Sequence, residues 1–385
     1  MTVESGQAES RGLEEIIGIS RYYGRDSEWV IAGGGNASWK NRETLWVKAS
    51  GTSLAGASRA TFVELDREKL APMWNKEYSR KTDEREREAL ADLMAAREAG
   101  QTLRPSVETG MHDVLPQAFV LHTHPTVINA VTCSANGEAV MREIAGGIPL
   151  LGDGIIWIPS INPGWVLSKR IFDEVKVYRD QHKDNPQVVV LQNHGITVAS
   201  EDVGDIHLMH RKLGEALLQK MSRVPDMGIA ETDLTVAAEA AGAIRHAAGD
   251  GVVVLFEAPG EVLKRASAAE TMAPLMRPFS PDHIVYAGHK PLYLESVRDI
   301  GDRYREYVQA EKTAPKIVVL KDVGFFAVGG NPKVAESARM LFRDALKITR
   351  YAENFGGPQG MPDAEIDFIR NWEVEQFRAE VSLKD

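Results

Sequence analysis

The chain contains the stretch Phe119-Val-Leu-His-Thr-His-Pro125, in which an apolar run leads directly into two histidines. The apolar residues predict a buried strand. Side chains alternate between the faces of a strand, so His122 and His124 should point the same way. A single histidine here would be interpreted as a satisfied core or surface residue. Two at this spacing predict a shared metal ion.

A third histidine stands at the end of a second apolar run, Gln187-Val-Val-Val-Leu-Gln-Asn-His-Gly195. Three imidazoles are a typical ligand set for catalytic zinc, which keeps an open position. His122, His124 and His194 are therefore the predicted metal ligands. His207 and His210 have helical spacing in the next segment, and we interpret them as surface or packing residues.

The composition limits the classes of function. The 385 residues carry a net charge of −10, are 43% hydrophobic and 26% charged, and contain one cysteine, Cys133. No basic block suggests a nucleic-acid partner, no apolar run approaches the ~20 residues of a membrane span, and the polar N-terminus does not resemble a signal peptide. A cytoplasmic enzyme or binding protein, without an internal disulfide, is expected.

Two turns could hold an anion. We predict a strand at 29–32 followed by Gly33-Gly-Gly-Asn-Ala-Ser38, and a strand at 44–48 followed by Ala49-Ser-Gly-Thr-Ser53. Glycine-rich turns let backbone N–H groups approach a phosphate closely. The alternative for the first is a tight β-turn between strands. Two such turns close together favour the phosphate site.

One carboxylate precedes the histidine strand. Ser106 is placed to cap a helix, with Glu108 in the first turn and His112 on the same face. Glutamates at this position commonly interact only with the helix dipole. Because this helix leads into the strand with His122, Glu108 could also approach the metal.

The second half partly repeats the first. The segment 316–328 aligns with the strand carrying His194, so that Val323 takes the place of that histidine. The segment 283–289 aligns with 118–124, with Ala287 at the place of His122 and only His289 retained. We expect this repeat to bind no metal.

Alternating strands and helices predict an α/β fold with a three-layer α/β/α lobe. The expected organisation is a disordered tail (1–12), a metal-binding catalytic domain (13–230), a smaller degenerate repeat α/β lobe (231–357) and a C-terminal helical tail (358–385).

The combined motifs resemble the class II aldolase/adducin family. Gly33-Gly-Gly-Asn-Ala-Ser38, Ala49-Ser-Gly-Thr52, Glu108, His122-Thr-His124 and Asn193-His194-Gly195 follow its order across roughly 13–225. The remainder, including Ser280-Pro-Asp-His283, resembles the aldolase portion of bifunctional rhamnulose-1-phosphate aldolase/alcohol dehydrogenase. The dehydrogenase domain is not matched, so no nicotinamide site is expected.

The resemblance implies a mixed, largely antiparallel sheet and a role for each matching residue. The three histidines would bind a divalent metal, most often Zn²⁺, with Mn²⁺, Co²⁺ or Fe²⁺ possible. Glu108 would be the catalytic carboxylate. The substrate phosphate would be held by Gly35, Asn36, Ser50, Gly51 and Ser106. Val107 departs from the family pattern, which often has a second hydroxyl residue there.

The implied activity is cleavage of a ketose 1-phosphate, such as rhamnulose or fuculose 1-phosphate, to dihydroxyacetone phosphate and an aldehyde through a metal-stabilised enediolate. The same site could serve a decarboxylase or an epimerase, and the family also includes non-catalytic, adducin-like scaffolds. A phosphorylated sugar is the expected small-molecule partner, and a homo-oligomer is the expected assembly.

Overall fold

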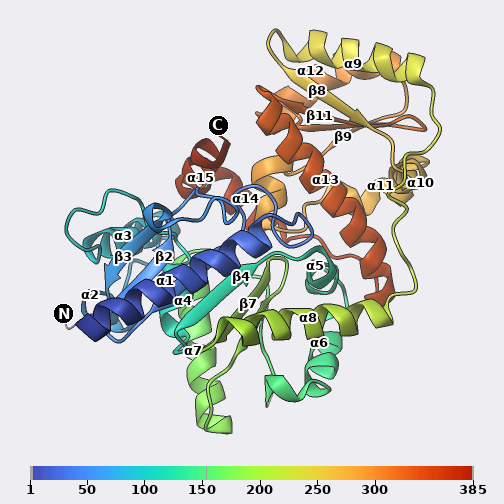
Figure 1. The fold of residues 1–385 in the computed structure, drawn as a ribbon. Coiled ribbons are helices and arrows are strands. Elements are labelled where there is room, and N and C mark those ends of the chain that lie inside the picture. The colour runs from blue at the N-terminus through green and yellow to red at the C-terminus, as the bar shows by residue number, and fades with distance from the viewer. Residues whose placement is uncertain (1–2, 153, 384–385) are drawn as a thin grey trace. The chain divides into compact units, whose positions relative to one another are not determined.

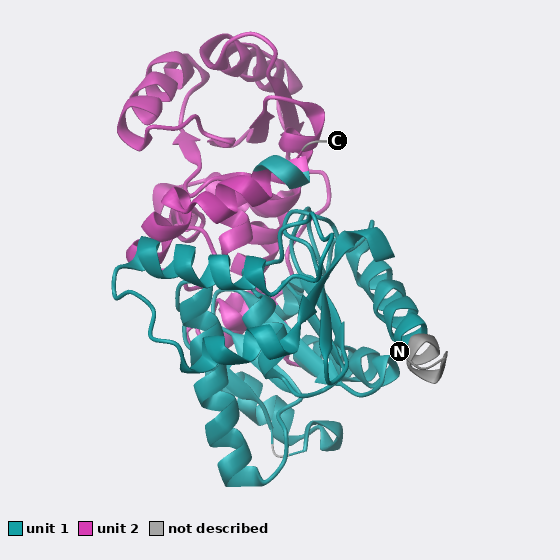
Figure 2. Ribbon diagram, turned by 90° about the vertical axis from the view of Figure 1, so that its left-hand side faces the viewer, with its two compact units in different colours: residues 1–128, 138–219, 380–382 teal, residues 129–137, 220–379, 383–385 magenta. Residues whose placement is uncertain are grey.

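The computed structural model describes residues 3–152 and 154–383, which form two compact units (Figure 2). Unit 1 takes residues 1–128, 138–219 and 380–382, and unit 2 takes 129–137, 220–379 and 383–385. The domain limits drawn from the sequence stay predictions.

Unit 1 is built on a seven-stranded mixed sheet with the order β3-β2-β1-β4-β7-β6-β5 (Figure 1). Only β5 and β6 pair in parallel; the other pairs are antiparallel. The predicted α/β class with a mixed sheet is confirmed, and β4, the strand of His122, lies at the centre. The strands are β1 (Asn36–Lys40), β2 (Thr44–Lys48), β3 (Phe62–Asp66), β4 (Phe119–Thr123), β5 (Ile156–Ile158), β6 (Val188–Leu191) and β7 (Gly195–Ser200).

Helices cover both faces of this sheet. Val120 of β4 packs in one core cluster with Met111 of α4 and Ile171 of α7. Thr123 faces the other way, and its Oγ1 lies 3.1 Å from Nε2 of the buried His210 on α8. The interpretation of His210 as a packing residue is confirmed. The helices with residues in unit 1 are α1 (Val3–Gly24), α2 (Arg67–Leu70), α3 (Thr82–Ala95), α4 (Thr109–Val114), α5 (Thr126–Thr132), α6 (Gly137–Gly146), α7 (Trp165–His182) and α8 (Val203–Lys220).

Two local predictions near the N-terminus were wrong. Residues 3–12, expected in a disordered tail, belong to α1, where Arg11 and Glu15 form an i,i+4 ion pair that favours a helix; residues 1–2 lie outside the described residues. Residues 29–32 form turns and irregular backbone instead of a strand, and Ala32 has a positive φ of 51°. The glycine run 33–35 therefore precedes strand β1 and does not follow a strand.

Unit 2 contains a four-stranded sheet with the order β8-β11-β10-β9. Helices α9 and α12 pack on one face around Val318 and Phe326, and Phe342 of α13 contacts Phe325 on the other (Figure 1). The strands are β8 (Val253–Glu257), β9 (Leu292–Leu294), β10 (Ile317–Leu320) and β11 (Gly324–Gly329). The helices are α9 (Leu234–Ala248), α10 (Gly260–Ala266), α11 (Ala269–Met272), α12 (Ile300–Glu311), α13 (Pro332–Ala352), α14 (Asp363–Asn371) and α15 (Glu373–Leu383), the last of which is shared between the units.

Short helical turns complete the described chain. They are a π-helix, His283–Ala287, and the 3₁₀ turns Arg59–Thr61, Ala71–Asn75, Pro149–Leu151, Ala273–Met276, Val297–Asp299 and Glu353–Phe355.

The unit 2 sheet repeats four strands of unit 1 in the same connectivity. In both hairpins the last residue pair before the turn is a leucine opposite a glycine: Leu191 with Gly195 and Leu320 with Gly324. Each turn contains a non-glycine residue with positive φ, 55° at Asn193 and 58° at Asp322. The predicted match of Val323 with His194 is therefore confirmed in the backbone.

The other half of the predicted repeat was wrong. Residues 283–287 form the π-helix, so they cannot correspond to strand β4. The counterpart of β4 is β8, because β8 pairs with β11 as β4 pairs with β7. In this register Val253-Val-Leu-Phe-Glu-Ala-Pro259 matches Phe119-Val-Leu-His-Thr-His-Pro125, and Phe256 and Ala258 stand where His122 and His124 stand. All three ligand positions are thus replaced in the repeat.

Candidate metal centre

The three predicted ligands meet at one point in unit 1. Their ligand atoms all lie within 4.8 Å of one another. Nε2 of His122 is 2.9 Å from Nε2 of His124 and 3.4 Å from Nε2 of His194. Two nitrogens bound at about 2.1 Å to a tetrahedral zinc ion would be about 3.4 Å apart, so the observed spacing fits a metal site.

The second nitrogen of His122 supports the same conclusion. Its Nδ1 lies 3.0 Å from the carbonyl oxygen of Ile196, which can only accept a hydrogen bond. Nδ1 therefore carries the proton, and Nε2 presents a bare lone pair toward the other imidazoles. A cation between these nitrogens relieves the opposition of lone pairs, and the fixed Nδ1–H orients the ring as metal-binding histidines require.

The turn of β6 and β7 delivers His194. Gly195 begins β7, and a Cβ there would lie 2.4 Å from the carbonyl oxygen of Thr123 and 2.8 Å from Cδ2 of His124. Only glycine permits this close approach of the two strands. The Asn193-His194-Gly195 motif thus places one ligand and makes room for another.

Glu108 reaches the histidines, as the sequence suggested. Its Oε1 is 3.5 Å from Nε2 of both His122 and His194. Its Oε2 accepts a hydrogen bond of 3.2 Å from Nδ2 of Asn36. Burial raises the pKa of Glu108, but the adjacent His122 and His194 outweigh burial and hold this pKa well below its ordinary value.

Glu108 precedes α4 instead of lying in its first turn. It is the N-cap residue, and its backbone N–H donates to Oγ of Ser106 at 3.2 Å. Ser106 therefore supports the start of the helix from a position two residues before the N-cap, which is Glu108. This arrangement fixes the backbone of Glu108, from which its carboxylate projects to the histidines.

The segments predicted to hold phosphate lie close together. Gly35 has a positive φ of 69°, and a Cβ there would lie 2.8 Å from Cδ1 of Leu54, just beyond the second turn. In that turn Gly51 has a φ of 80°, and the N–H of Ser50 donates to the carbonyl oxygen of Arg104, two residues before Ser106. Their role in phosphate binding stays a prediction.

Asn36 makes a contact that the sequence did not suggest. It is almost fully buried and pairs across the sheet with His122, so its amide faces Glu108. Because Asn36 and Glu108 are 72 positions apart in the sequence, no local pattern predicts this hydrogen bond. The side chain is oriented toward the carboxylate, which makes it a positioning residue for Glu108.

The buried hydrogen bonds that link α4 to strand β1 were not predicted from the sequence either. His112 donates or accepts a 2.8 Å hydrogen bond with Oγ of Ser38, and Nζ of Lys40 donates to its carbonyl oxygen at 2.8 Å. Burial lowers the pKa of His112 to about 3, so the ring is neutral at physiological pH. This network ties α4, and thus Glu108, to strand β1.

Lys40 should make stability depend on pH. Burial lowers its pKa from 10.5 to about 7, and the nearby carboxylate of Asp113 only partly opposes this. Between these two values the unfolded chain binds more protons than the folded chain, so stability rises with pH. We expect the unfolding free energy of the wild type, minus that of Lys40→Met, to increase with pH from about pH 7 upward. Denaturant unfolding at several pH values measures this, with exposed Lys69→Met as the control. A constant difference between the wild type and Lys40→Met would contradict it.

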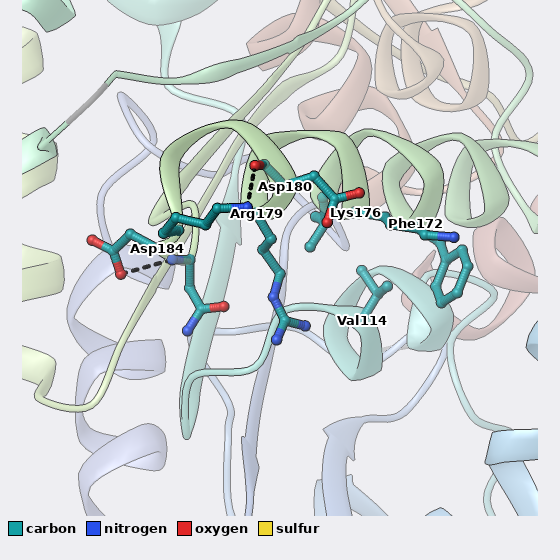
Figure 3. Close-up of a pocket in the computed structure, with 9 residues that line it drawn as sticks. Val114, Phe172, Lys176, Arg179, Asp180 and Asp184 are labelled. Atoms are coloured by element: carbon teal, nitrogen blue, oxygen red, sulfur yellow. Dashed lines mark hydrogen bonds between the residues drawn. The ribbon is translucent and has the colours of Figure 1, made fainter.

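A separate surface cavity of about 610 Å³ lies along the C-terminal half of α7 (Figure 3). Its lining contains both basic and acidic side chains, including Lys176, Arg179, Asp180 and Asp184. None of the histidines or predicted phosphate-binding residues lines it. We interpret it as a solvated helix end with no part in the chemistry.

Sequence comparison identifies the family. Residues 14–217 match the class II aldolase and adducin N-terminal domain. The chain belongs to this family. Its three histidines are consistent with a divalent metal site, as is typical of class II aldolases. Among the described helices, none is both long enough and apolar enough to cross a membrane.

The chain is also similar to proteins that are distant in sequence. "Uncharacterized oxidoreductase YuxG" of Bacillus subtilis is 22% identical over 96% of the chain, which spans 58% of that relative's length. The N-terminal class II aldolase domain of a Thermoplasma acidophilum protein is 24% identical over 54% of this chain and 92% of its own, with a TM-score of 0.45. An L-fuculose 1-phosphate aldolase is 15% identical over 55% of this chain and 84% of its own, with a TM-score of 0.36.

Proposed function

We propose that the protein is a metal-dependent aldolase that cleaves a ketose 1-phosphate, such as rhamnulose or fuculose 1-phosphate, to dihydroxyacetone phosphate and an aldehyde. The observation that supports this most is the position of Glu108, a partly buried carboxylate whose Oε1 atom lies 3.5 Å from two of the three converging imidazole nitrogens. A structural metal site has no need for such a carboxylate, whereas aldol cleavage needs a group that moves protons.

Each residue has a role in this proposal. His122, His124 and His194 would hold the cation, most readily Zn²⁺, and leave a position open for substrate. When bound, the cation would supply Lewis-acid stabilisation for the charge that develops on the substrate oxygens.

Glu108 would transfer the proton. As the C3–C4 bond breaks, the C4 hydroxyl loses its proton to give the aldehyde and an enediolate remains; uptake of a proton at C3 of the enediolate, through Glu108, then yields dihydroxyacetone phosphate. Asn36 holds the Oε2 atom of Glu108 and leaves its Oε1 atom toward the histidines, which orients the carboxylate for this step.

The two turns would hold the phosphate at the remote end of the substrate. Gly35 and Gly51 have positive φ values that suit backbone N–H groups pointing at an anion. Ser50 and Ser106 add hydroxyl donors. Fixing the phosphate orients the reacting carbons without a charged side chain from these turns.

A substrate panel tests the reaction class. The purified protein, loaded with Zn²⁺ or Mn²⁺, should release dihydroxyacetone phosphate from at least one ketose 1-phosphate, as measured by a coupled assay. Release of carbon dioxide without an aldehyde would instead identify a decarboxylase, and interconversion of epimers without cleavage would identify an epimerase. A protein that takes up metal but transforms no member of the panel would favour the scaffold alternative. The phosphorylated sugar as substrate and the homo-oligomeric assembly remain predictions.

A further inference from the structure

Unit 2 contains a cavity of about 390 Å³ that is not related to the histidine site. This volume is within the range of pockets that hold small metabolites. The π-helix, through Ile284 and Val285, and Ile369 of α14 contribute apolar lining. The residues 312–314 are exposed, so the cavity opens to solvent there. π-Helical turns are rare and are frequently found at functional sites.

One side chain in this cavity is a cation without a counter-charge. Nζ of Lys316 donates to the carbonyl oxygen of Val285 at 2.6 Å. No carboxylate of the described residues forms an ion pair with it, and its two remaining N–H groups have no protein acceptor there. Burial lowers the pKa of Lys316 to about 8, with no charged neighbour contributing.

The carboxylates of the cavity are already neutralised by other groups. Glu311 accepts a 2.7 Å hydrogen bond from Nε2 of His289 and lies 3.7 Å from Nη1 of Arg370. Glu375 pairs with Arg378 at 3.1 Å. Neither is within ion-pair distance of Lys316, so the cavity keeps an excess of positive charge.

Lys316 is partly buried, and an ammonium that has lost part of its hydration costs free energy unless a partner compensates it. We propose that the cavity is a binding site for a small oxyanion-bearing metabolite, a phosphomonoester or a carboxylate, whose charged group pairs with the ammonium of Lys316. The apolar wall beside the π-helix would contact the rest of the molecule. This site does not depend on the proposed aldol cleavage, because no residue is shared with it.

Chemical labelling of the intact 385-residue chain tests the site directly. Lys316 should be acetylated readily by acetic anhydride at about pH 8, because a lysine with a lowered pKa is partly neutral there. Inorganic phosphate or succinate should slow acetylation of Lys316 severalfold and leave exposed Lys333 unchanged, as measured by peptide mass spectrometry. Protection by phosphate alone indicates a phosphomonoester site, protection by succinate alone a carboxylate site, and protection by both a general oxyanion site. No protection by either at millimolar concentration overturns the proposal.

A variant separates binding from a structural role. Lys316→Met keeps a similar side-chain volume and removes the unpaired charge, so its thermal unfolding midpoint should equal or exceed that of the wild type. Succinate should raise the midpoint of the wild type and of Lys333→Met but not that of Lys316→Met if the site takes carboxylates; phosphate is the probe if labelling selects it. A lowered midpoint for Lys316→Met, with no anion effect on the wild type, would show that Lys316 only supports the π-helix. If the variant does not fold, labelling of the wild type still decides whether an oxyanion binds at Lys316.

Discussion

Replacing His122 with alanine should leave the protein almost free of divalent metal, whereas the wild type should bind about one ion per chain. His122 lies at the centre of the cluster, 2.9 and 3.4 Å from the other two Nε2 atoms. Changes to groups that merely orient a metal ligand cost about 10–100-fold in affinity, so loss of the central ligand should cost more. Elemental analysis of protein purified in metal-supplemented medium measures the stoichiometry, and titration against a chelator measures the affinity.

His207→Ala is the matched control for this experiment. His207 is a half-buried histidine of the same unit, and it contacts Tyr23 and Tyr22 instead of the cluster. The control should retain the full metal content. Stoichiometric metal in His122→Ala would show that the three histidines are not the site.

Replacing Glu108 with glutamine should lower turnover by about 10²–10⁴-fold, the usual contribution of a positioned proton-transfer group. Glutamine has nearly the same shape and can still accept the hydrogen bond from Asn36, but it cannot take up and return a proton. Metal content should remain unchanged, because the three imidazoles are untouched. The turnover number on the best substrate of the panel and the metal stoichiometry are measured on the same preparation.

The control for this substitution is Glu138→Gln, which removes an exposed carboxylate paired with Arg142 in α6. It should leave turnover unchanged. Unchanged turnover in Glu108→Gln would rule out the proton-transfer role, and loss of metal together with activity would instead place Glu108 among the ligands.

Local sequence patterns correctly predicted that the three histidines converge. The two-residue period of a strand placed His122 with His124, and the apolar run before Asn193 placed His194 at the end of a core strand. Each of these inferences depends on residues within about ten positions of one another, where backbone geometry alone sets the direction of a side chain. The same local pattern also identified the hairpin of β10 and β11 as a repeat of β6 and β7.

Local patterns failed where pairing partners are distant. The segment 283–289 resembles a strand by composition, yet residues 283–287 form a π-helix, and β8 takes the place of β4. The apolar run 29–32 resembles a strand, but β1 begins only at Asn36, after the glycines. Strand identity in these cases depends on which edge of the sheet is free to pair, and that information is not contained in the segment itself.

The sequence by itself determined which three histidines converge, the glycine turns and the α/β class, because spacing and residue type fix these within short segments. Tertiary structure alone decided what surrounds them. The amide of Asn36 meets Glu108 across 72 residues, His112 is buried against Ser38 and Lys40, and Lys316 lies without a counter-charge beside the π-helix. These contacts follow from sheet register and burial, which depend on the packing of the whole unit.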